Sequence, residues 1–314
     1  MAIQARTFEQ IVAIGKESTF GTPVSPTFAM PITNFEATDQ IEANLAQGRR
    51  GVPSVTFGSV AGTGHCEFTL EGECYPAAIG HLLFGILGAD SVSGSEAPYT
   101  HSFSNAATPP SYTIVERVIN ANSGSRRIAG ARFGQLTFSW NAGEGVIAYN
   151  LTGMGLMTES VNADGTAVTA ETPWPGWRQA VTSSGLDDLV AGGEIAITRE
   201  LQVVHTGEDN RSPRHINVGP TQVNGNLLVA VEANLAVYDM FRASTRQSLN
   251  ILFDDATASR SIGFQMTDCL LTAAPAEIDR GGVSVFLRLN FEGIHNSTDA
   301  GPIEVEVENS VASY

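Results

Sequence analysis

Apolar and polar residues alternate along most of this chain with a period of two, which is typical of β-strands that bury one face. The stretch FSWNAGEGVIAYNLTG (138–153) contains two such runs joined by a glycine-rich turn, and it predicts a β-hairpin. A similar layout recurs at 279–293, DRGGVSVFLRLNFEG. A hairpin that occurs twice indicates an internal repeat.

Two stretches upstream of these hairpins also match. GHCEFTLEGECYPAAIGHLL begins at Gly64 and GNLLVAVEANLAVYDMFRAS at Gly225, an offset of 161 (225 − 64). Each predicts a strand that runs into a short helix, with Pro76 early in the first helix and Asn234 as N-cap of the second. The hairpin ends align at an offset of 140 (293 − 153), and the loop-like segment 91–111 accounts for the difference. Chance similarity between two β-rich halves is the alternative.

The chain is therefore expected to be mainly β, with two tandem units that each contain one short helix. The predicted parts are an N-terminal extended arm with the first strands (1–60), a first unit (61–155), a connector (156–190), a second unit (191–298) and a C-terminal arm (299–314). Trp174 and Trp177 in the connector are expected to dock on this subunit or on a neighbour.

The composition and the motifs limit which functions the chain can have. The 17 Lys and Arg against 33 Asp and Glu leave a formal charge of −16, which disfavours phosphate neutralisation and serves either solubility or the repulsion of polyanions. The sequence contains none of the common nucleophile, phosphate-loop or zinc motifs. One set of possible metal ligands, His65, Cys66, Cys74 and His81, has a spacing that matches no known zinc pattern. We therefore expect no enzyme activity, metal or cofactor.

Three cysteines are an odd number, which argues against a disulfide framework. The most apolar stretch, 77–89, is too short to span a bilayer and predicts a buried helix. No signal peptide is recognisable at the start of the sequence. These features predict assembly in a reducing cytoplasm without a membrane partner.

The stretch AIGKESTFGTPVSPTFAMPI (13–32) carries a family pattern. Its pattern residues are Gly15, Glu17, Phe20, Gly21, Thr22 and Pro23. They resemble the opening of major tail tube proteins of long-tailed, siphovirus-type bacteriophages. The strand and helix at 64–88 and the strand pair at 193–225 are also similar to that family, so the resemblance covers most of 8–293.

The resemblance implies that each unit is a small β-sandwich or split barrel. Sheets of neighbouring units would close into an inner β-barrel, and rings would stack into a hollow tube through which DNA passes without specific binding. A duplicated unit implies a three-chain ring with pseudo-sixfold symmetry, and a true hexamer is the alternative. Implied partners are other copies, the tape measure protein, the tail terminator and the distal tail protein. The place of action would be the virion tail, after assembly in the host cytoplasm.

The same resemblance suggests two sets of functional residues. Glu67, Glu71 and Glu232 are candidates for the wall that faces DNA, and Phe20, Gly21, Thr22 and Pro23 for an arm that contacts neighbouring subunits. Competing interpretations are another virion protein (distal tail, terminator or capsid decoration) and a secreted carbohydrate-binding sandwich. The latter should carry a signal peptide and a row of exposed aromatic residues.

Overall fold

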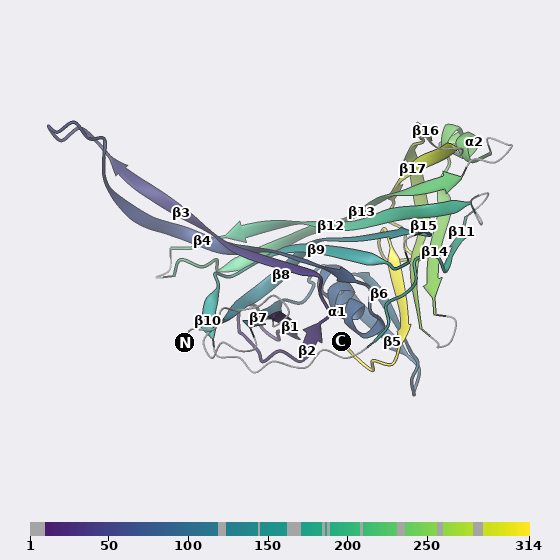
Figure 1. Ribbon diagram of the computed structural model, residues 1–314, viewed down its shortest axis with the longest axis horizontal. Helices are drawn as coiled ribbons and strands as arrows, with labels where there is room; N and C mark the ends of the chain where they lie inside the picture. The colour runs from purple at the N-terminus through teal and green to yellow at the C-terminus, as the bar shows by residue number, and fades with distance from the viewer. Residues whose placement is uncertain are drawn as a thin grey trace.

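The computed structural model describes residues 10–118, 124–143, 145–161, 171–183, 186, 189–207, 210–230, 236–255, 260–278 and 285–314. Within these ranges the chain is mainly β, as predicted, and every strand pairing is antiparallel (Figure 1). Glu232 and Asn234, both singled out from the sequence, lie outside the described residues.

The elements have the following bounds: β1 Gln10–Lys16, β2 Phe28–Met30, β3 Asn34–Gln47, β4 Thr56–Glu73, α1 Pro76–Leu87, β5 Gly88–Ser93, β6 Tyr99–Asn105, β7 Tyr112–Val118, β8 Ser125–Asn141, β9 Ala148–Gly155, β10 Glu159–Val161, β11 Gln179–Thr182, β12 Val190–Val204, β13 His215–Ala230, α2 Ala236–Ala243, β14 Gln247–Asp254, β15 Ser261–Ala273, β16 Ala276–Ile278, β17 Val285–Gly293 and β18 Glu304–Asn309.

One long sheet runs along the molecule in the order β3-β4-β9-β8-β12-β13-β17-β15, with β16 continuing β15 along β17. The first halves of β8 and β15 leave this sheet and join two side sheets. Side sheet 1 has the order β2-β1-β7-β8-β10, and side sheet 2 has the order β11-β14-β15-β18-β6-β5. Helix α1 lies under the long sheet between the side sheets (Figure 1). Within the described residues the long sheet is open at both ends.

The strand pairing repeats within the long sheet. The order β3-β4-β9-β8 recurs as β12-β13-β17-β15, and two of the register shifts in each set match. These shifts fall between Ile41 and Ala43 in β3, Arg199 and Leu201 in β12, Phe133 and Gln135 in β8, and Leu271 and Ala273 in β15. The first two are equivalent at an offset of 158 (199 − 41) and the last two at 138 (271 − 133). Hairpin β3–β4 therefore corresponds to hairpin β12–β13, and β8 corresponds to β15, with their register shifts at equivalent positions.

The structure corrects the residue alignment that we expected from the sequence. Gly64 on β4 is the partner of Ile41, and Thr221 on β13 is the partner of Arg199, so β4 and β13 match at an offset of 157 (221 − 64) rather than 161. For β9 and β17 the offset is 138 rather than 140. Both errors, four and two residues, are even. An even shift keeps each side chain on the same face of its strand, so the predicted core faces were correct although the pairing was not.

An exchange of large and small residues explains why few identities mark the repeat. Phe68 on β4 pairs with Gly153 on β9, and at the equivalent place Gly225 on β13 pairs with Phe291 on β17. A Cβ atom on Gly153 would lie 2.5 Å from Cζ of Phe68, and one on Gly225 would lie 2.4 Å from Cζ of Phe291. Each glycine therefore makes room for a ring, but on opposite strands of the pair.

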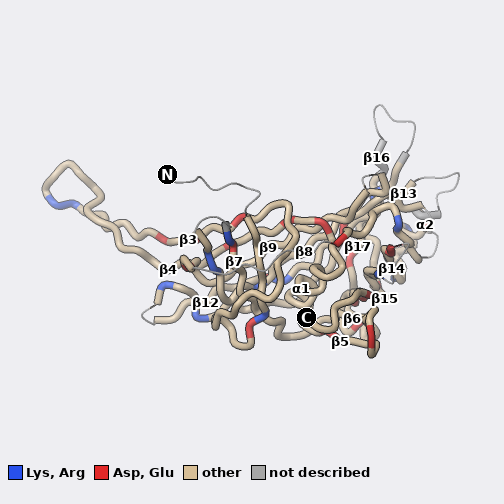
Figure 2. The backbone as a smooth tube through the Cα atoms, turned by 60° about the horizontal axis from the view of Figure 1, so that its bottom comes forward, with Lys and Arg blue, Asp and Glu red and all other residues tan. Residues whose placement is uncertain are grey.

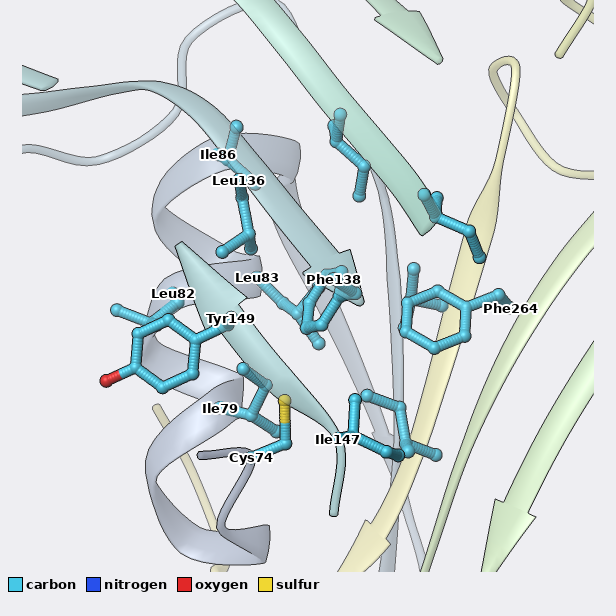
Figure 3. Close-up of a cluster of buried hydrophobic side chains, with 14 of the residues drawn as sticks. Cys74, Ile79, Leu82, Leu83, Ile86, Leu136, Phe138, Ile147, Tyr149 and Phe264 are labelled. Atoms are coloured by element: carbon cyan, nitrogen blue, oxygen red, sulfur yellow. The ribbon is translucent and has the colours of Figure 1, made fainter. Parts of the chain in front are cut away.

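Helix α1 is the buried helix predicted at 77–89. Pro76 takes an early helical position, and Gly88, at φ 95°, ends the helix with its N–H donating to the Phe84 carbonyl. Its apolar side chains meet the core face of β8 and β9 (Figure 3). The contacts involve Ile79, Leu82, Leu83 and Ile86 from the helix with Leu136, Phe138 and Tyr149 from the strands. The helix thus covers one face of the long sheet and leaves the other uncovered.

Two segments expected to be irregular belong to side sheet 2. Segment 91–111, predicted as a loop, contributes to the hairpin β5–β6. Segment 299–314, predicted as an arm, contains β18, which pairs with β15 and β6 of the same chain. Its alternation places Val305 and Val307 in the core, and Tyr314 is also buried. The segment is therefore part of this subunit's core and is not a free arm.

The connector also packs on this subunit. Trp174 is 1% exposed, its main-chain N–H donates to the Cys74 carbonyl at 3.1 Å, and its main-chain carbonyl accepts from the N–H of Ile147 at 3.2 Å. Trp177, in contrast, remains 60% exposed. The first tryptophan thus docks within the subunit, as one of the two alternatives predicted.

Candidate functional site

The face of the long sheet opposite α1 is largely polar, although Leu228 on β13 and Leu270 at the β15 edge also lie on it. Directly paired residues form rows across the strands. One row is Glu36, Thr69, Thr152, Gln135, Thr198 and Gln222, and the next is Asn34, Glu71, Asn150, Thr137, Ala196, Asn224 and Glu292. The first row borders a concavity of about 540 Å³. We call this surface the polar face. It offers carboxylates, amides and hydroxyls to whatever lies over it.

Two of the three predicted glutamates lie on the polar face. Glu67 is paired with Thr38 and Met154, and it accepts a hydrogen bond from Nε2 of Gln40 at 3.2 Å. Glu71 accepts hydrogen bonds from Nδ2 of Asn150 at 2.8 Å and of Asn34 at 3.4 Å. Sequence reasoning missed Glu36, Glu194 and Glu292 on the same face. Alternation within their strands was a usable signal, but only strand pairing shows that they share a surface.

The side chains considered as metal ligands do not form a site. Cys66 and Cys74 are fully buried, and burial raises the pKa of both thiols, to about 12 for Cys66. His81 lies between the rings of Phe28 and Tyr314, and desolvation lowers its pKa to about 4. No three His, Cys, Asp or Glu side chains converge as metal ligands in the described ranges.

The N-terminal motif is tied into its own subunit by a buried carboxylate. Glu17 is 6% exposed, and its two oxygens accept four hydrogen bonds, which tie the turn after β1 to β7 and β8. The donors are the N–H of Gly21 (3.0 Å), Oγ of Ser111 (2.7 Å), Oγ1 of Thr113 (2.8 Å) and the N–H of Gly130 (2.9 Å).

The predicted arm residues follow this carboxylate. The ring of Phe20 lies 5.6 Å from that of His215, and the guanidinium of Arg132 lies 5.4 Å from the Phe20 ring centroid. Phe20 and Gly21 therefore pack within this subunit, whereas Thr22 and Pro23 are exposed. Contact of these residues with a neighbouring subunit stays a prediction.

A projecting hairpin supplies the most exposed apolar surface. Beyond the register shift after Ile41, β3 and β4 leave the body of the molecule and end in a tip that carries Arg49 and Arg50 (Figures 1 and 2). Large apolar side chains along this hairpin are exposed: Ile41 (47%), Leu45 (56%), Val52 (54%), Val55 (66%) and Val60 (66%). The segment 1–60 thus contributes β1 and β2 to side sheet 1, and its extended part is this hairpin. Exposed apolar surface of this kind marks a contact with another molecule.

The two ends of the long sheet are the other unpaired surfaces. Among the described residues, β3 pairs with β4 alone, so its outer edge is free. At the other end, Leu270–Ala273 of β15 and all of β16 are paired on one side only, with β17. Open edges of this length are aggregation hazards unless a further strand covers them.

Comparison of the sequence with known proteins gives a family match. No helix in the described ranges has the length and apolar character needed to cross a membrane. No curated protein matches the chain. A family model described as phage tail tube protein matches residues 7–308, nearly the whole sequence. The chain therefore belongs to the phage tail tube protein family.

Proposed function

We propose that this structural protein of the phage tail forms rings of three chains, which stack into the tail tube and conduct the genome during ejection. The observation that carries the proposal is the junction between the two repeats. Strand β8 of the first repeat pairs with β12 of the second, and β12 is the equivalent of β3. At the two ends of the sheet, the free strand β15 is the equivalent of β8, and the free strand β3 is the equivalent of β12.

The internal junction supplies a register for the contact between chains. Gln135 pairs with Thr198 across the junction. Adding 138 to the first and subtracting 158 from the second gives Ala273 and Gln40. We therefore expect residues 273–278 of one chain to pair antiparallel with residues 35–40 of the next. This pairing covers both open edges of every chain and closes the sheet into a barrel.

The number of strands that each chain supplies sets the diameter of the closed barrel. Each chain supplies eight strands to the long sheet, β3, β4, β9, β8, β12, β13, β17 and β15 with its continuation β16. Three chains give 24 strands. With a strand spacing of about 4.8 Å and a tilt of about 40°, the backbone diameter is about 50 Å, and six chains would double it. The repeat supports three chains, because two equivalent units per chain already provide six around the ring.

A disulfide cross-link tests this ring. The variant that combines Gln40→Cys with Ala273→Cys places one thiol on each predicted edge. Oxidation of assembled protein is expected to produce a covalent ladder that ends at three chains on a denaturing gel. Gln40→Cys combined with Ser139→Cys, an exposed position inside the sheet on β8, is the matched control and should stay monomeric. A ladder that continues to six chains would support the hexamer, and the absence of any cross-link in assembled tubes would refute the register.

We further propose that the polar face lines the channel. Helix α1 covers the opposite face, so only the polar face can be directed at the centre without exposing the core. Carboxylates there gain nothing from phosphate and release no counterions, so DNA slides without adhering. Glu67 and Glu71 are the residues assigned to this wall, and Glu232 is proposed with them from its sequence position alone.

Charge reversal tests the channel. Combining Glu67→Lys with Glu71→Lys adds six lysines per ring of three (3 × 2), and tubes should still form because the core face is unchanged. Retention of duplex DNA in such tubes is expected to increase by at least tenfold at low salt and to fall as salt is added. Glu96→Lys combined with Glu306→Lys, both away from the long sheet, is the control. Equal retention by the two variants would place Glu67 and Glu71 outside the channel.

A further inference from the structure

We propose that the tip of the first hairpin, residues 48–55, docks on the second hairpin (β12–β13) of the neighbouring chain in the same ring. The proposal rests on the three-chain ring proposed above, and it assigns a binding partner to the most exposed apolar segment of the described chain. The partner is a second copy of this chain, and the contact surface is the outer part of β13, residues 215–222.

Each chain already contains an equivalent contact between its own two hairpins. Strand β9 stops at Gly155, opposite Cys66, so the outer part of β4 is paired with β3 but not with β9 on its other side. The turn of the second hairpin fills this space. Gly64 donates its N–H to the carbonyl of Arg211 at 3.0 Å, and Nε of Arg211 donates to the carbonyl of Gly62 at 2.7 Å. Through these bonds the tip of the second hairpin holds the first hairpin at its register shift.

The receiving surface is duplicated in the second hairpin. At an offset of 157, Gly62 corresponds to Gly219. Glu42, the single β3 residue that faces two residues of β4 at the shift, corresponds to Glu200 at the offset of 158. A Cβ on Gly62 would lie 2.8 Å from Cβ of Glu42, and one on Gly219 would lie 3.4 Å from Cβ of Glu200. The same two residue types therefore form the same close backbone approach in both hairpins.

Among the described residues, one of the two hairpin tips contacts the other hairpin of the same chain. The second tip binds the first hairpin, whereas the first tip has no hairpin before it and exposes Val52 and Val55. The second receiving surface has no β17 strand beside it, because β17 pairs with β13 only from Asn224 onward; within this subunit its ends contact Phe20 through the His215 ring and Asn105 through the Thr221 hydroxyl. Around the ring, the first hairpin of the next chain follows the second hairpin of this one. Each tip would then rest on the hairpin that precedes it.

The receiving surface differs in one respect. The carbonyl of Gly219 already accepts a hydrogen bond from Nε of Arg199 at 2.9 Å, so it does not need the arginine that Gly62 takes from the second tip. The incoming tip instead offers two valines and the guanidinium groups of Arg49 and Arg50, and the exposed carboxylate of Glu200 lies on the receiving hairpin. We expect valine packing and charge pairing with Glu200 to replace the contact made by Arg211.

A second cysteine pair tests the docking. Val52→Cys combined with Pro220→Cys, both exposed, should form disulfides between chains in isolated rings, before any stacking, with a ladder that ends at three. Val52→Cys with Val92→Cys, which is 41% exposed on side sheet 2, should give no such ladder. Cross-links that appear only in stacked tubes would show that the tip reaches the next ring, and would overturn the proposal, as would their absence from both rings and tubes.

The two cysteine pairs separate the proposals. If the Gln40 and Ala273 pair gives no cross-link, the proposed register between chains is wrong, and if its ladder continues to six, the three-chain ring is wrong. If that pair links three chains but the Val52 and Pro220 pair does not, the ring stands and the docking of the tip is wrong.

Discussion

Replacing Glu17 with alanine is expected to lower the free energy of unfolding by about 3–5 kcal/mol, because it removes the acceptor for several buried donors at once. The carboxylate is 6% exposed and receives four hydrogen bonds from the turn after β1, from β7 and from β8. Two of the four donors are main-chain N–H groups that cannot rotate toward other partners. Each donor left buried without an acceptor costs about 1–3 kcal/mol, and partial hydration reduces the sum.

Chemical denaturation at neutral pH measures this effect. Ser18→Ala, next in the chain and exposed, is the control and should change the free energy of unfolding by less than about 0.5 kcal/mol. Glu17→Gln should lie between the two, because the amide keeps one acceptor oxygen but turns an NH₂ group toward the donors. A loss below 1 kcal/mol for Glu17→Ala would show that the carboxylate does not hold the N-terminal motif in place.

Replacing Gly80 with alanine is expected to cost about 2–3 kcal/mol, although alanine is the better helix former. The position lies inside α1, where the exchange would normally stabilise the helix by about 0.5–1 kcal/mol. Here the ring of Tyr314 lies directly over the glycine, and a Cβ would be 2.1 Å from its Cζ and 2.3 Å from its Cε2. The hydroxyl of Tyr314 is also held by Asn309, so the ring cannot easily move away.

The double variant tests the stated cause. In a Tyr314→Ala background the ring is absent, so Gly80→Ala should become stabilising by about 0.5–1 kcal/mol, the helix propensity difference alone. Thermal or chemical unfolding of the four proteins in this cycle measures the coupling. Gly48→Ala, where no atom lies within 4 Å of the new Cβ, is a control for the substitution. The same loss in both backgrounds would show that the Tyr314 ring is not responsible.

Much of the local structure was predictable because it depends on neighbours in the sequence. Alternation identified the core faces of β4, β8 and β9, since successive side chains of a strand point to opposite sides. Pro76 marked the start of α1, because its fixed φ angle and missing N–H suit the first turn of a helix. The presence of two similar halves was also visible as a repeated order of strand and helix patterns.

Tertiary structure decided which strands meet and in what register. Pairing depends on contacts between distant residues, so the exchange of Phe68 and Gly153 for Gly225 and Phe291 left almost no identity to align. The hairpin β5–β6 and strand β18 joined a common sheet for the same reason. Single strands showed polar positions, but only their pairing assembled these into the polar face. Sequence alone therefore determined helix α1 and the buried sides of strands such as β4, β8 and β9, whereas the fold determined the repeat register, because a two-residue period is unchanged by any even shift.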